Sequence, residues 1–269
     1  MNRRVKIGVF GGSGFYNLLE KAKEIDIETS YGKPSDKITI GEYKGKQVAF
    51  LPRHGKEHQY PPHRIPYRAN LAAFKELGVE YVIGPCAAGS LQPRIKPGDF
   101  VILDQFVDRT WGREDTIFNG PKGQVAHFAM SDPYCPALRE IASRSCDELK
   151  IPFHKNGTAV VIQGPRFSTK SESRWFASQG WETINMTQYP ECYLAREMGM
   201  CYVGIALITD YDVGVEGRED IKPVTMEEVI KTFNSNNEKV KDLIFKIIEK
   251  LPPEKLICGC QDALKNALI

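Results

Sequence analysis

The sequence predicts a single α/β domain over residues 1–269, built on a mixed, mostly parallel central sheet flanked by helices. Three observations lead to this prediction. Short β-rich runs alternate with helical segments along the whole chain, as in folds where helices cross between parallel strands. Several of these runs are continuously apolar, as strands covered on both faces must be. A chain of 269 residues that is 42% hydrophobic can also bury a sizeable core.

Seven apolar runs are expected to form the strands of this sheet. In chain order they cover residues 5–10, 47–52, 81–87, 100–107, 158–164, 183–187 and 202–210. An acidic run at 24–29 is a further strand candidate. Polar residues follow several of these strands directly, and such strand ends are where open α/β sheets bind their ligands.

Helices are expected between the strands, because residues that start and stop helices flank the intervening segments. The last helix is the clearest, since Thr225 and Glu228 cap it, one face is apolar, and Pro252 follows it. The three others are a helix opened by Pro136 over 136–150, one with a Thr169 and Glu172 capping box before 173–180, and one opened by Pro190 over 190–199.

The charge balance and hydropathy limit the class of partner. The chain has 36 basic and 34 acidic residues, without a basic run interleaved with aromatic residues, so nucleic acid is not expected. No N-terminal run resembles a signal peptide, and no segment approaches the roughly 20 apolar residues of a membrane span. We therefore expect a cytoplasmic protein, without membrane contact, that acts on a small molecule.

The first strand leads into a glycine turn, "KIGVFGGSGFYNLLE", at residues 6–20. A dinucleotide fingerprint needs a third glycine where Asn17 stands, which argues against a dinucleotide-dependent oxidoreductase. The turn and the Ser13 hydroxyl suit a single phosphate group. A tight turn without any ligand is the alternative.

The second strand is followed by "PRHGKEH", residues 52–58. Its H-x-x-E-H spacing marks a zinc peptidase only on a helix, and Gly55 and the nearby prolines oppose a helix here, so no metal is expected. Arg53 and His54 are better interpreted as groups presented to an oxyanion. A solvated basic loop is the alternative.

Two carboxylates follow the last strand, in "ITDYDVG" at 208–214. Asp210 and Asp212 flank Tyr211, and alternate residues of an extended segment point to the same side. Two acids placed in this way favour a ring with several hydrogen-bond donors, or proton transfer to it. The run of small residues at 84–91 would let a ligand approach backbone N–H groups, or would serve close packing.

Seven cysteines occur, most of them in apolar segments where they are expected to be buried small hydrophobes. Cys258 and Cys260 form a C-terminal "CGC". They are too few for a zinc site by themselves, but close enough for a strained disulfide or a redox pair. Intracellular disulfides are typical of hyperthermophiles, which suggests a thermophilic source.

These motifs occur together and in order, and the set resembles the methylthioadenosine phosphorylases of the purine nucleoside phosphorylase superfamily, in its trimeric class. The matching motifs are "GGSGFY", "PRHGKEH", "IPYRANLAAFKELGVEYVI", "GSL", "DQFVDRT", "GPRFST", "INMT" with "PE", and "TDYD". Each motif alone is modest, but eight in register are specific. The resemblance extends from about Lys6 to the CGC tail and implies the purine nucleoside phosphorylase-like fold.

The resemblance implies phosphorolysis of 5'-methylthioadenosine to adenine and 5-methylthioribose 1-phosphate, in purine and methionine salvage. Phosphate would be a co-substrate, and neither a cofactor nor a metal is implied. The implied assembly is a homotrimer, or a hexamer made of two trimers. The CGC motif resembles the tail pair of thermophilic members.

The resemblance also assigns site residues by position. The phosphate group would be held by Ser13, Arg53, His54, Cys86, Ala87 and Thr187. The ribose would lie beside Met186, and the purine would be received by Phe167, Ser168, Asp210 and Asp212. The 5'-methylthio pocket would be formed by His58, Met226, Val229 and Ile230. His127 would reach a neighbouring subunit's site.

The implied chemistry explains the residue types. Loss of adenine leaves an oxocarbenium-like sugar, which a phosphate held beside Arg53 and His54 can stabilise and attack. Asp210 is the candidate to protonate the leaving purine at N7, if its pKa is raised, while Asp212 accepts a hydrogen bond from the 6-amino group. The catalytic set is therefore expected to be Asp210, Asp212 and His54.

Two residues depart from the family pattern. Cys86 stands where better-known members have a threonine beside the phosphate, and Gln163 replaces a glutamate before "GPRFS". Both suggest a divergent subgroup with a relaxed 5' preference. The alternative function is a broader purine nucleoside phosphorylase that accepts adenosine, or 6-oxopurine nucleosides such as inosine, guanosine or methylthioinosine. A non-catalytic purine sensor would be expected to lose the two acids or the Arg53–His54 pair, and all are present.

Overall fold

The computed structural model of the chain describes residues 5–11, 19–118, 124–214, 221, 223–265 and 267. The strands are β1 (Ile7–Phe10), β2 (Glu20–Ile25), β3 (Ile38–Tyr43), β4 (Lys46–Leu51), β5 (Tyr81–Ser90), β6 (Phe100–Ile102), β7 (Gln105–Arg109), β8 (Phe153–His154), β9 (Thr158–Ile162), β10 (Thr183–Asn185) and β11 (Cys201–Asp210). The helices are α1 (Tyr67–Leu77), α2 (Pro136–Leu149), α3 (Lys170–Ser178), α4 (Gln188–Glu197) and α5 (Met226–Lys250), with 3-10 turns at Pro62–Arg64 and Cys260–Asp262.

All the described strands belong to one sheet, whose main path runs β2-β3-β4-β1-β5-β10-β9-β7. The centre is parallel: β1 pairs with β4 and β5, and β5 also pairs with β11. Antiparallel pairs join β2 to β3 and β3 to β4, and β10 to β5. The predicted α/β class with a mixed, mostly parallel sheet is therefore confirmed.

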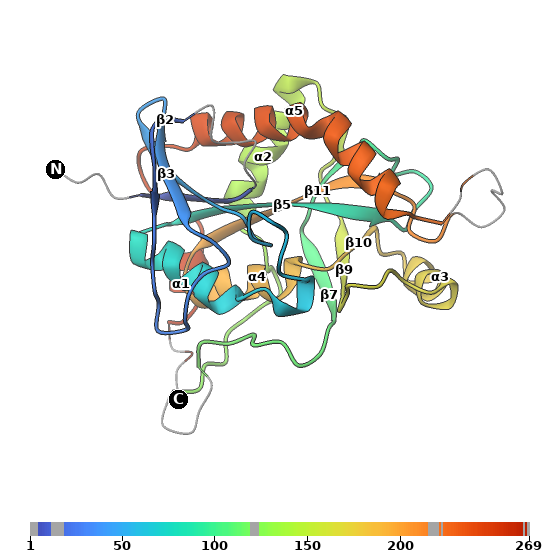
Figure 1. Cartoon of the computed structure of the whole chain (residues 1–269), viewed down its shortest axis with the longest axis horizontal. Helices are drawn as coiled ribbons and strands as arrows, with labels where there is room; N and C mark the ends of the chain where they lie inside the picture. The colour runs from blue at the N-terminus through green and yellow to red at the C-terminus, as the bar shows by residue number, and fades with distance from the viewer. Residues whose placement is uncertain are drawn as a thin grey trace.

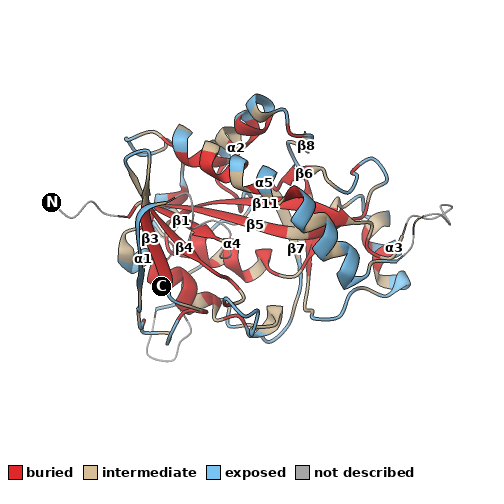
Figure 2. Cartoon of the chain, turned by 45° about the horizontal axis from the view of Figure 1, so that its top comes forward, coloured by how far each residue is buried: buried red, intermediate tan, exposed pale blue. Residues whose placement is uncertain are grey.

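Helices cover both faces of the sheet, α2 and α5 on one side and α1 and α4 on the other (Figure 1). Side chains that alternate along the strands feed two separate cores: Ile83 of β5 packs with the α2 and α5 residues, and Val82 with those of α1 and α4. The central strands are consequently buried along most of their length, as Figure 2 shows. Continuously apolar strand sequences are the expected result of this double cover.

The central strand β5 changes partner along one edge. Its register with β1 ends at Val9 and Ile83, and its register with β10 begins only at Gly89. On the opposite edge β11 accompanies β5 throughout. Within the described chain, Gly84–Ala88 therefore has no strand partner on one side. Such a change of partner opens a crevice at the carboxyl ends of parallel strands, where ligands bind in open α/β folds.

Most predicted elements are present, but one predicted strand was wrong because it combined two separate strands. Residues 100–107 are not one strand but two, β6 and β7, which pair with different neighbours. The chain turns between them because Leu103 donates its N–H to Gly204 while the Asp104 carboxylate accepts the Gly157 N–H. Helix α1 and the strands β3 and β8 had not been predicted. The acidic strand lies earlier than expected, at β2 rather than 24–29.

The helix starts confirm the capping predictions. Thr169 and Glu172 form a reciprocal capping box at α3, and the Thr225 hydroxyl accepts the Glu228 N–H at α5. In the described part of the chain, none of the helices has the length and apolarity that crossing a membrane would need.

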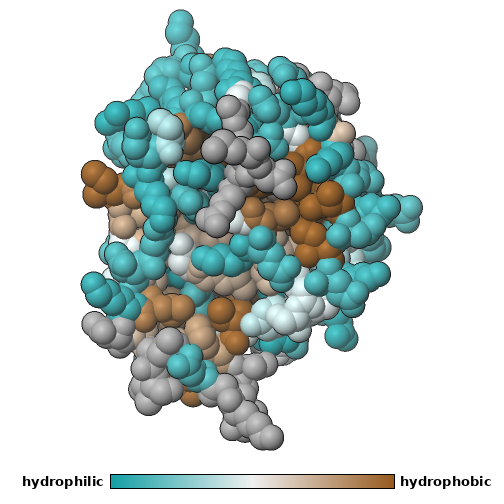
Figure 3. Space-filling model, turned by 90° about the vertical axis from the view of Figure 1, so that its left-hand side faces the viewer, coloured by the Kyte–Doolittle hydropathy of each residue, from teal (hydrophilic) through white to brown (hydrophobic). Residues whose placement is uncertain are grey.

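The face of the molecule that carries α1, β2 and β3 presents several apolar patches among hydrophilic side chains (Figure 3). A cleft of about 930 Å³ lies on the α1 and α4 side of the sheet, against the C-terminal segment. Tyr31, Leu77, Ile117 and Met198 are among the residues that line it. Apolar surface of this kind is typical of a face that meets another protein chain.

Candidate active site

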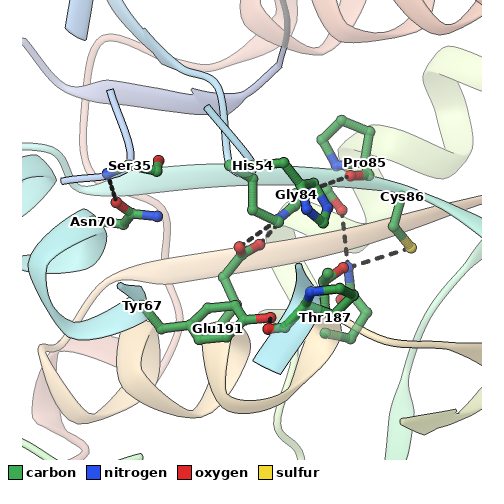
Figure 4. Close-up of polar contacts among 12 residues, drawn as sticks. Ser35, His54, Tyr67, Asn70, Gly84, Pro85, Cys86, Thr187 and Glu191 are labelled. Atoms are coloured by element: carbon green, nitrogen blue, oxygen red, sulfur yellow. Dashed lines mark hydrogen bonds and ion pairs between the residues drawn. The ribbon is translucent and has the colours of Figure 1, made fainter. Parts of the chain in front are cut away.

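Arg53 lies directly after β4 and is held in a buried ion pair. Its Nε and Nη2 atoms donate to the two carboxylate oxygens of Glu191 on α4, at 2.6 and 2.7 Å, and its Nη1 donates to the carbonyl of Pro85 at 2.9 Å. Glu191 is fully buried and also accepts from the Tyr202 hydroxyl at 2.5 Å. Figure 4 shows Glu191 rising from α4 toward Pro85 of β5.

The ion pair fixes the charge and direction of Arg53. Burial disfavours its charged form, but the adjacent Glu191 carboxylate outweighs burial, so the pKa of Arg53 lies above its ordinary value. Of the five N–H groups of a guanidinium, three are used by Glu191 and Pro85. Two N–H groups have no hydrogen-bond partner in the described chain, and these suit an oxyanion.

His54 follows Arg53 and is a neutral group at pH 7. Burial lowers the pKa of this imidazole to about 4. Its Nδ1 lies 2.9 Å from the carbonyl oxygen of Tyr60. Because a carbonyl only accepts hydrogen bonds, Nδ1 bears the proton and Nε2 is left as an acceptor. In this state Nε2 of His54 can accept a hydrogen bond from a hydroxyl group but cannot donate one.

The unpaired stretch of β5 lies beside Arg53. Its Gly84 carbonyl accepts from Gln188 Nε2 at 3.1 Å, and this nitrogen is also 3.6 Å from Cys86 Sγ. Burial raises the pKa of the Cys86 thiol to about 12, so it is a neutral group and not a nucleophile at pH 7. Ala87 follows it on the strand. Thr187 begins α4 without using its hydroxyl as a helix cap, which leaves that hydroxyl available.

The two predicted carboxylates lie beside Gly89, just beyond the unpaired stretch of β5. Asp210 ends β11 opposite Gly89 of β5. Its Oδ1 accepts the Asp212 N–H and its Oδ2 accepts the Thr209 hydroxyl, both at 2.7 Å. Burial raises the pKa of Asp210 and of Asp212 above their ordinary range. Each is therefore a better proton donor near neutral pH than an exposed aspartate.

Asp212 differs from Asp210 in having an unpaired oxygen. Its backbone has the positive φ of 51°, and its side chain is buried. Its Oδ2 atom and the Ser168 Oγ atom are both buried without a well-aligned hydrogen bond in the described chain. Burial has the largest effect on the pKa of Asp212, and the nearby Ser173 and Ser168 hydroxyls partly offset it. Buried polar atoms are rarely left unpaired, so these two atoms indicate where a ligand with hydrogen-bonding groups would be received.

One arginine that sequence reasoning missed joins the loops around this end of the site. Arg113 donates to the backbone carbonyls of Gln163, Met186 and Tyr189 at 2.9, 3.0 and 2.5 Å. Gln163 in turn exchanges hydrogen bonds with the Trp111 backbone. Gln163, which replaces the glutamate of the family pattern, therefore has a structural role in joining Trp111 and Arg113. Met186 is held close to Gly164, where an added Cβ would lie 2.6 Å from its sulfur.

The structure describes all of the remaining predicted site residues except Ser13. His58 stacks on His54, with ring centroids 4.5 Å apart. Phe167 is largely exposed, as are Met226 and Ile230 on the first turns of α5, with Val229 half-buried between them. His127 is exposed and its N–H donates to the carbonyl of Ala267 in the tail. Ser13 lies outside the described residues.

The structure also adds Glu191, Tyr202 and Gln188, which had received no role. Glu191 is the only charged residue in "PECYLA", residues 190–195, and a buried acid needs a cationic partner. That signal was available in the sequence. The partner was not, because Arg53 and Glu191 are 138 residues apart in the chain.

The fold is that of an α/β enzyme, and the described residues place a buried arginine and two largely buried carboxylates beside β5. The chain belongs to the phosphorylase superfamily, whose family model matches residues 6–249. It is 52% identical, over 98% of its length and 99% of the relative's, to S-methyl-5'-thioadenosine phosphorylase of Pyrococcus horikoshii.

Two further comparisons bear on the substrate. The structure of methylthioadenosine phosphorylase from Schistosoma mansoni in complex with adenine is similar, with a TM-score of 0.90, 35% identity and coverage of 97% of this chain and 96% of that one. A purine nucleoside phosphorylase of Streptomyces coelicolor is 44% identical over 97% of this chain and 95% of the relative.

Proposed function

We propose that this protein catalyses the phosphorolysis of 5'-methylthioadenosine to adenine and 5-methylthioribose 1-phosphate. The observation that carries the proposal is the stretch of β5 that lacks a strand partner on one edge, with the charged guanidinium of Arg53 at Pro85 and the two carboxylates beside Gly89. Cys86 and Gly89 are three residues apart, which is about 10 Å along a strand. That separation leaves room for a sugar between a phosphate and a purine.

At the anion end, Arg53 binds phosphate and stays positively charged because Glu191 is beside it. The two spare N–H groups of Arg53 bind phosphate oxygens, because the other three keep the guanidinium fixed on Glu191 and Pro85. The Thr187 hydroxyl and the Ala87 backbone are neighbouring donors. His54 Nε2 accepts a hydrogen bond from a hydroxyl group, either of a protonated phosphate or of the sugar. Phosphate held in this way lies next to the oxocarbenium-like sugar that it attacks.

At the purine end, the carboxylates act on the leaving base. A protonated Asp210, favoured by burial, donates to N7 as the glycosidic bond breaks. The unpaired Oδ2 of Asp212 accepts from the 6-amino group, and the Ser168 hydroxyl offers a further hydrogen bond. A 6-oxo group would instead place its lone pair against the Asp212 carboxylate, which the site disfavours.

A second candidate function is broader purine nucleoside phosphorolysis. It is favoured by the 44% identity to the purine nucleoside phosphorylase of Streptomyces coelicolor. The exposure of Met226 and Ile230, which would form the 5' pocket, is consistent with a loosely built 5' side. Adenosine is then the first additional substrate to examine, followed by inosine.

The proposal also covers the co-substrate, the oligomeric state and the cellular compartment. Phosphate is the co-substrate and no cofactor takes part. The enzyme assembles as a homotrimer or a hexamer, in which the exposed His127 reaches the neighbouring subunit's site. The cytoplasm is the proposed compartment.

A nucleoside panel with and without phosphate tests the function. Release of adenine from 5'-methylthioadenosine is expected only with phosphate, together with a sugar 1-phosphate. Arg53→Lys keeps the charge but loses the paired donors, and it should raise the KM for phosphate more than the KM for the nucleoside. Equal base release without phosphate would identify a hydrolase and overturn the proposal, whereas faster cleavage of inosine would establish the second candidate.

A further inference from the structure

The guanidinium of Arg113 holds two turns that are distant in the sequence. Arg113 lies in the segment after β7. Its Nη2 atom donates to the Gln163 carbonyl, and its Nη1 atom donates to the carbonyls of Met186 and Tyr189. Gln163 directly follows β9, whereas Met186 and Tyr189 lie on either side of the start of α4, after β10. Because β9 and β10 are parallel neighbours in the sheet, the two turns lie side by side at one edge.

These two turns carry opposite ends of the proposed site. The turn after β9 leads to Ser168, which is proposed to receive the purine, and the turn after β10 contains Thr187, which is proposed to bind phosphate. Thr187 lies between Met186 and Tyr189, the two residues whose carbonyls accept from Arg113 Nη1. Arg113 therefore links the backbone of the phosphate subsite to the backbone of the purine subsite.

The segment after β7 is itself anchored to α4. The fully buried carboxylate of Glu197 accepts the Thr116 hydroxyl at 2.6 Å and the Ile117 N–H at 2.8 Å. The Tyr189 hydroxyl donates to the Asp115 carboxylate at 2.7 Å. This stretch is thereby fixed to a helix, so the guanidinium just before it is a stable point of attachment for both turns.

We propose that Arg113 is a positioning residue that sets the distance between the phosphate and purine subsites, an inference that rests on the proposed function. The ligand-binding groups have supports of their own, since Glu191 fixes Arg53 and two hydrogen bonds fix Asp210. Loss of Arg113 would therefore leave both ligands bound but free the two turns to move relative to each other. Displacements of about 1 Å between reacting groups can cost roughly 100-fold in rate, so turnover should be affected more than binding.

The shape of the arginine side chain matters, because one planar group reaches both turns. A guanidinium presents its N–H donors in a rigid fork, and the Nη1 and Nη2 atoms of Arg113 donate to different turns. A lysine ammonium carries the same charge on a single nitrogen, so it cannot hold both turns in this way. Arg113→Met and Arg113→Lys thus separate the loss of the charge from the loss of the fork.

The test measures kcat and both KM values with the nucleoside that the wild type cleaves fastest, and counts intact sites by calorimetric titration with the released base. The control is Arg139→Met, which removes an arginine that also donates to a backbone carbonyl, that of Lys155, but from α2 on the other face of the sheet. A wild type that prefers inosine would overturn the proposed substrate, while the Arg113 variants would still decide the role of this residue.

In both Arg113 variants kcat should fall by about 10- to 100-fold, while both KM values change by less than about threefold and roughly one base is still bound per chain. The control should match the wild type. A wild-type kcat in Arg113→Met or in Arg113→Lys would overturn the proposal. So would a kcat that falls only in proportion to the number of base-binding sites, because Arg113 would then support folding alone.

Discussion

The side chain of Glu191 decides what Arg53 is able to do. A guanidinium in a buried crevice is costly unless it is paired, and Glu191 supplies that pair through two short hydrogen bonds. The pair is bidentate, so it also fixes the plane of the guanidinium. The anion end of the site is therefore rigid before any substrate binds.

Removing this carboxylate should be costly to stability. Glu191→Gln leaves the Arg53 charge buried without a counterion, and we expect the free energy of unfolding to fall by about 3–5 kcal/mol. Chemical denaturation measures it. The control is Glu140→Gln, whose exposed pairs with Arg144 and Lys155 are screened by solvent and should contribute little to stability. Equal losses in the two variants would contradict the role given to the buried pair.

The choice of purine is expected to depend on Asp212. The wild type should prefer 5'-methylthioadenosine to inosine by at least on the order of 100-fold in kcat/KM, roughly 2.7 kcal/mol. Asp212→Asn replaces an acceptor with a group that can also donate, so the preference should narrow by about tenfold. Steady-state kinetics on both nucleosides measure the ratio, and an unchanged ratio would refute the assignment.

Asp210 should behave differently, since it is the candidate proton donor. Asp210→Asn can still accept the Asp212 N–H through Oδ1, so the local fold should persist. Its kcat should fall on every purine tested while the ratio between purines changes little. Asp132→Asn, an exposed position away from the crevice, is the control.

Among the secondary-structure elements, β5 contributes most to the proposed site, because the proposed phosphate and purine subsites lie along its unpaired stretch and at its Gly89 end. A side chain at Gly89 would place its Cβ 2.9 Å from Asp210 Oδ1 and 3.3 Å from the Asp212 Cβ. Asp210 is fixed by two hydrogen bonds and has little room to move.

Gly89→Ala should therefore impair catalysis more than folding. We expect kcat/KM for 5'-methylthioadenosine to fall by roughly 10- to 100-fold, as displacements of about 1 Å at a catalytic group can cause. Gly259→Ala, where an added Cβ meets nothing within 4 Å, should be silent. A Gly89→Ala enzyme with unchanged kinetics would show that the spacing of β5 and Asp210 does not matter.

Comparison of the predicted and observed elements shows which parts of the fold and the site could be predicted from the sequence. The buried strands and capped helices were predictable, because continuous apolar runs and the Thr169 and Thr225 caps are local signals. Strand β2, "EKAKEI", is mostly exposed and charged, so it lacks the apolar run that marked the others. Asp210, Asp212 and Arg53 could be found at strand ends, but Gln188 and Glu191 take their structural roles from partners about 100 residues away or more.

At the scale of the whole molecule, the proposed assembly predicts that the exposed His127 contributes to a neighbouring subunit's site. Light scattering should give a mass of three or six chains. His127→Ala and Asp210→Asn chains should each be poorly active alone. When co-expressed, they should regain part of the activity, since some sites then combine an intact Asp210 with a neighbour's intact His127. Mixed oligomers that remain as inactive as the two parents would exclude a shared site.

The partner change along β5 also bears on how the chain acquires its structure. Thr209 of β11 reaches back to Ala88 of β5 across 121 positions of sequence, and β10 is nearly as distant. During synthesis, the edges of β5 therefore stay largely unpaired until the last third of the chain, which contains β10 and β11, has been made. Unpaired strand edges tend to pair with other chains. Contacts this distant in sequence are also slow to form. The crevice is thus completed late in folding, and chains truncated before β10 should aggregate rather than persist as partly active fragments.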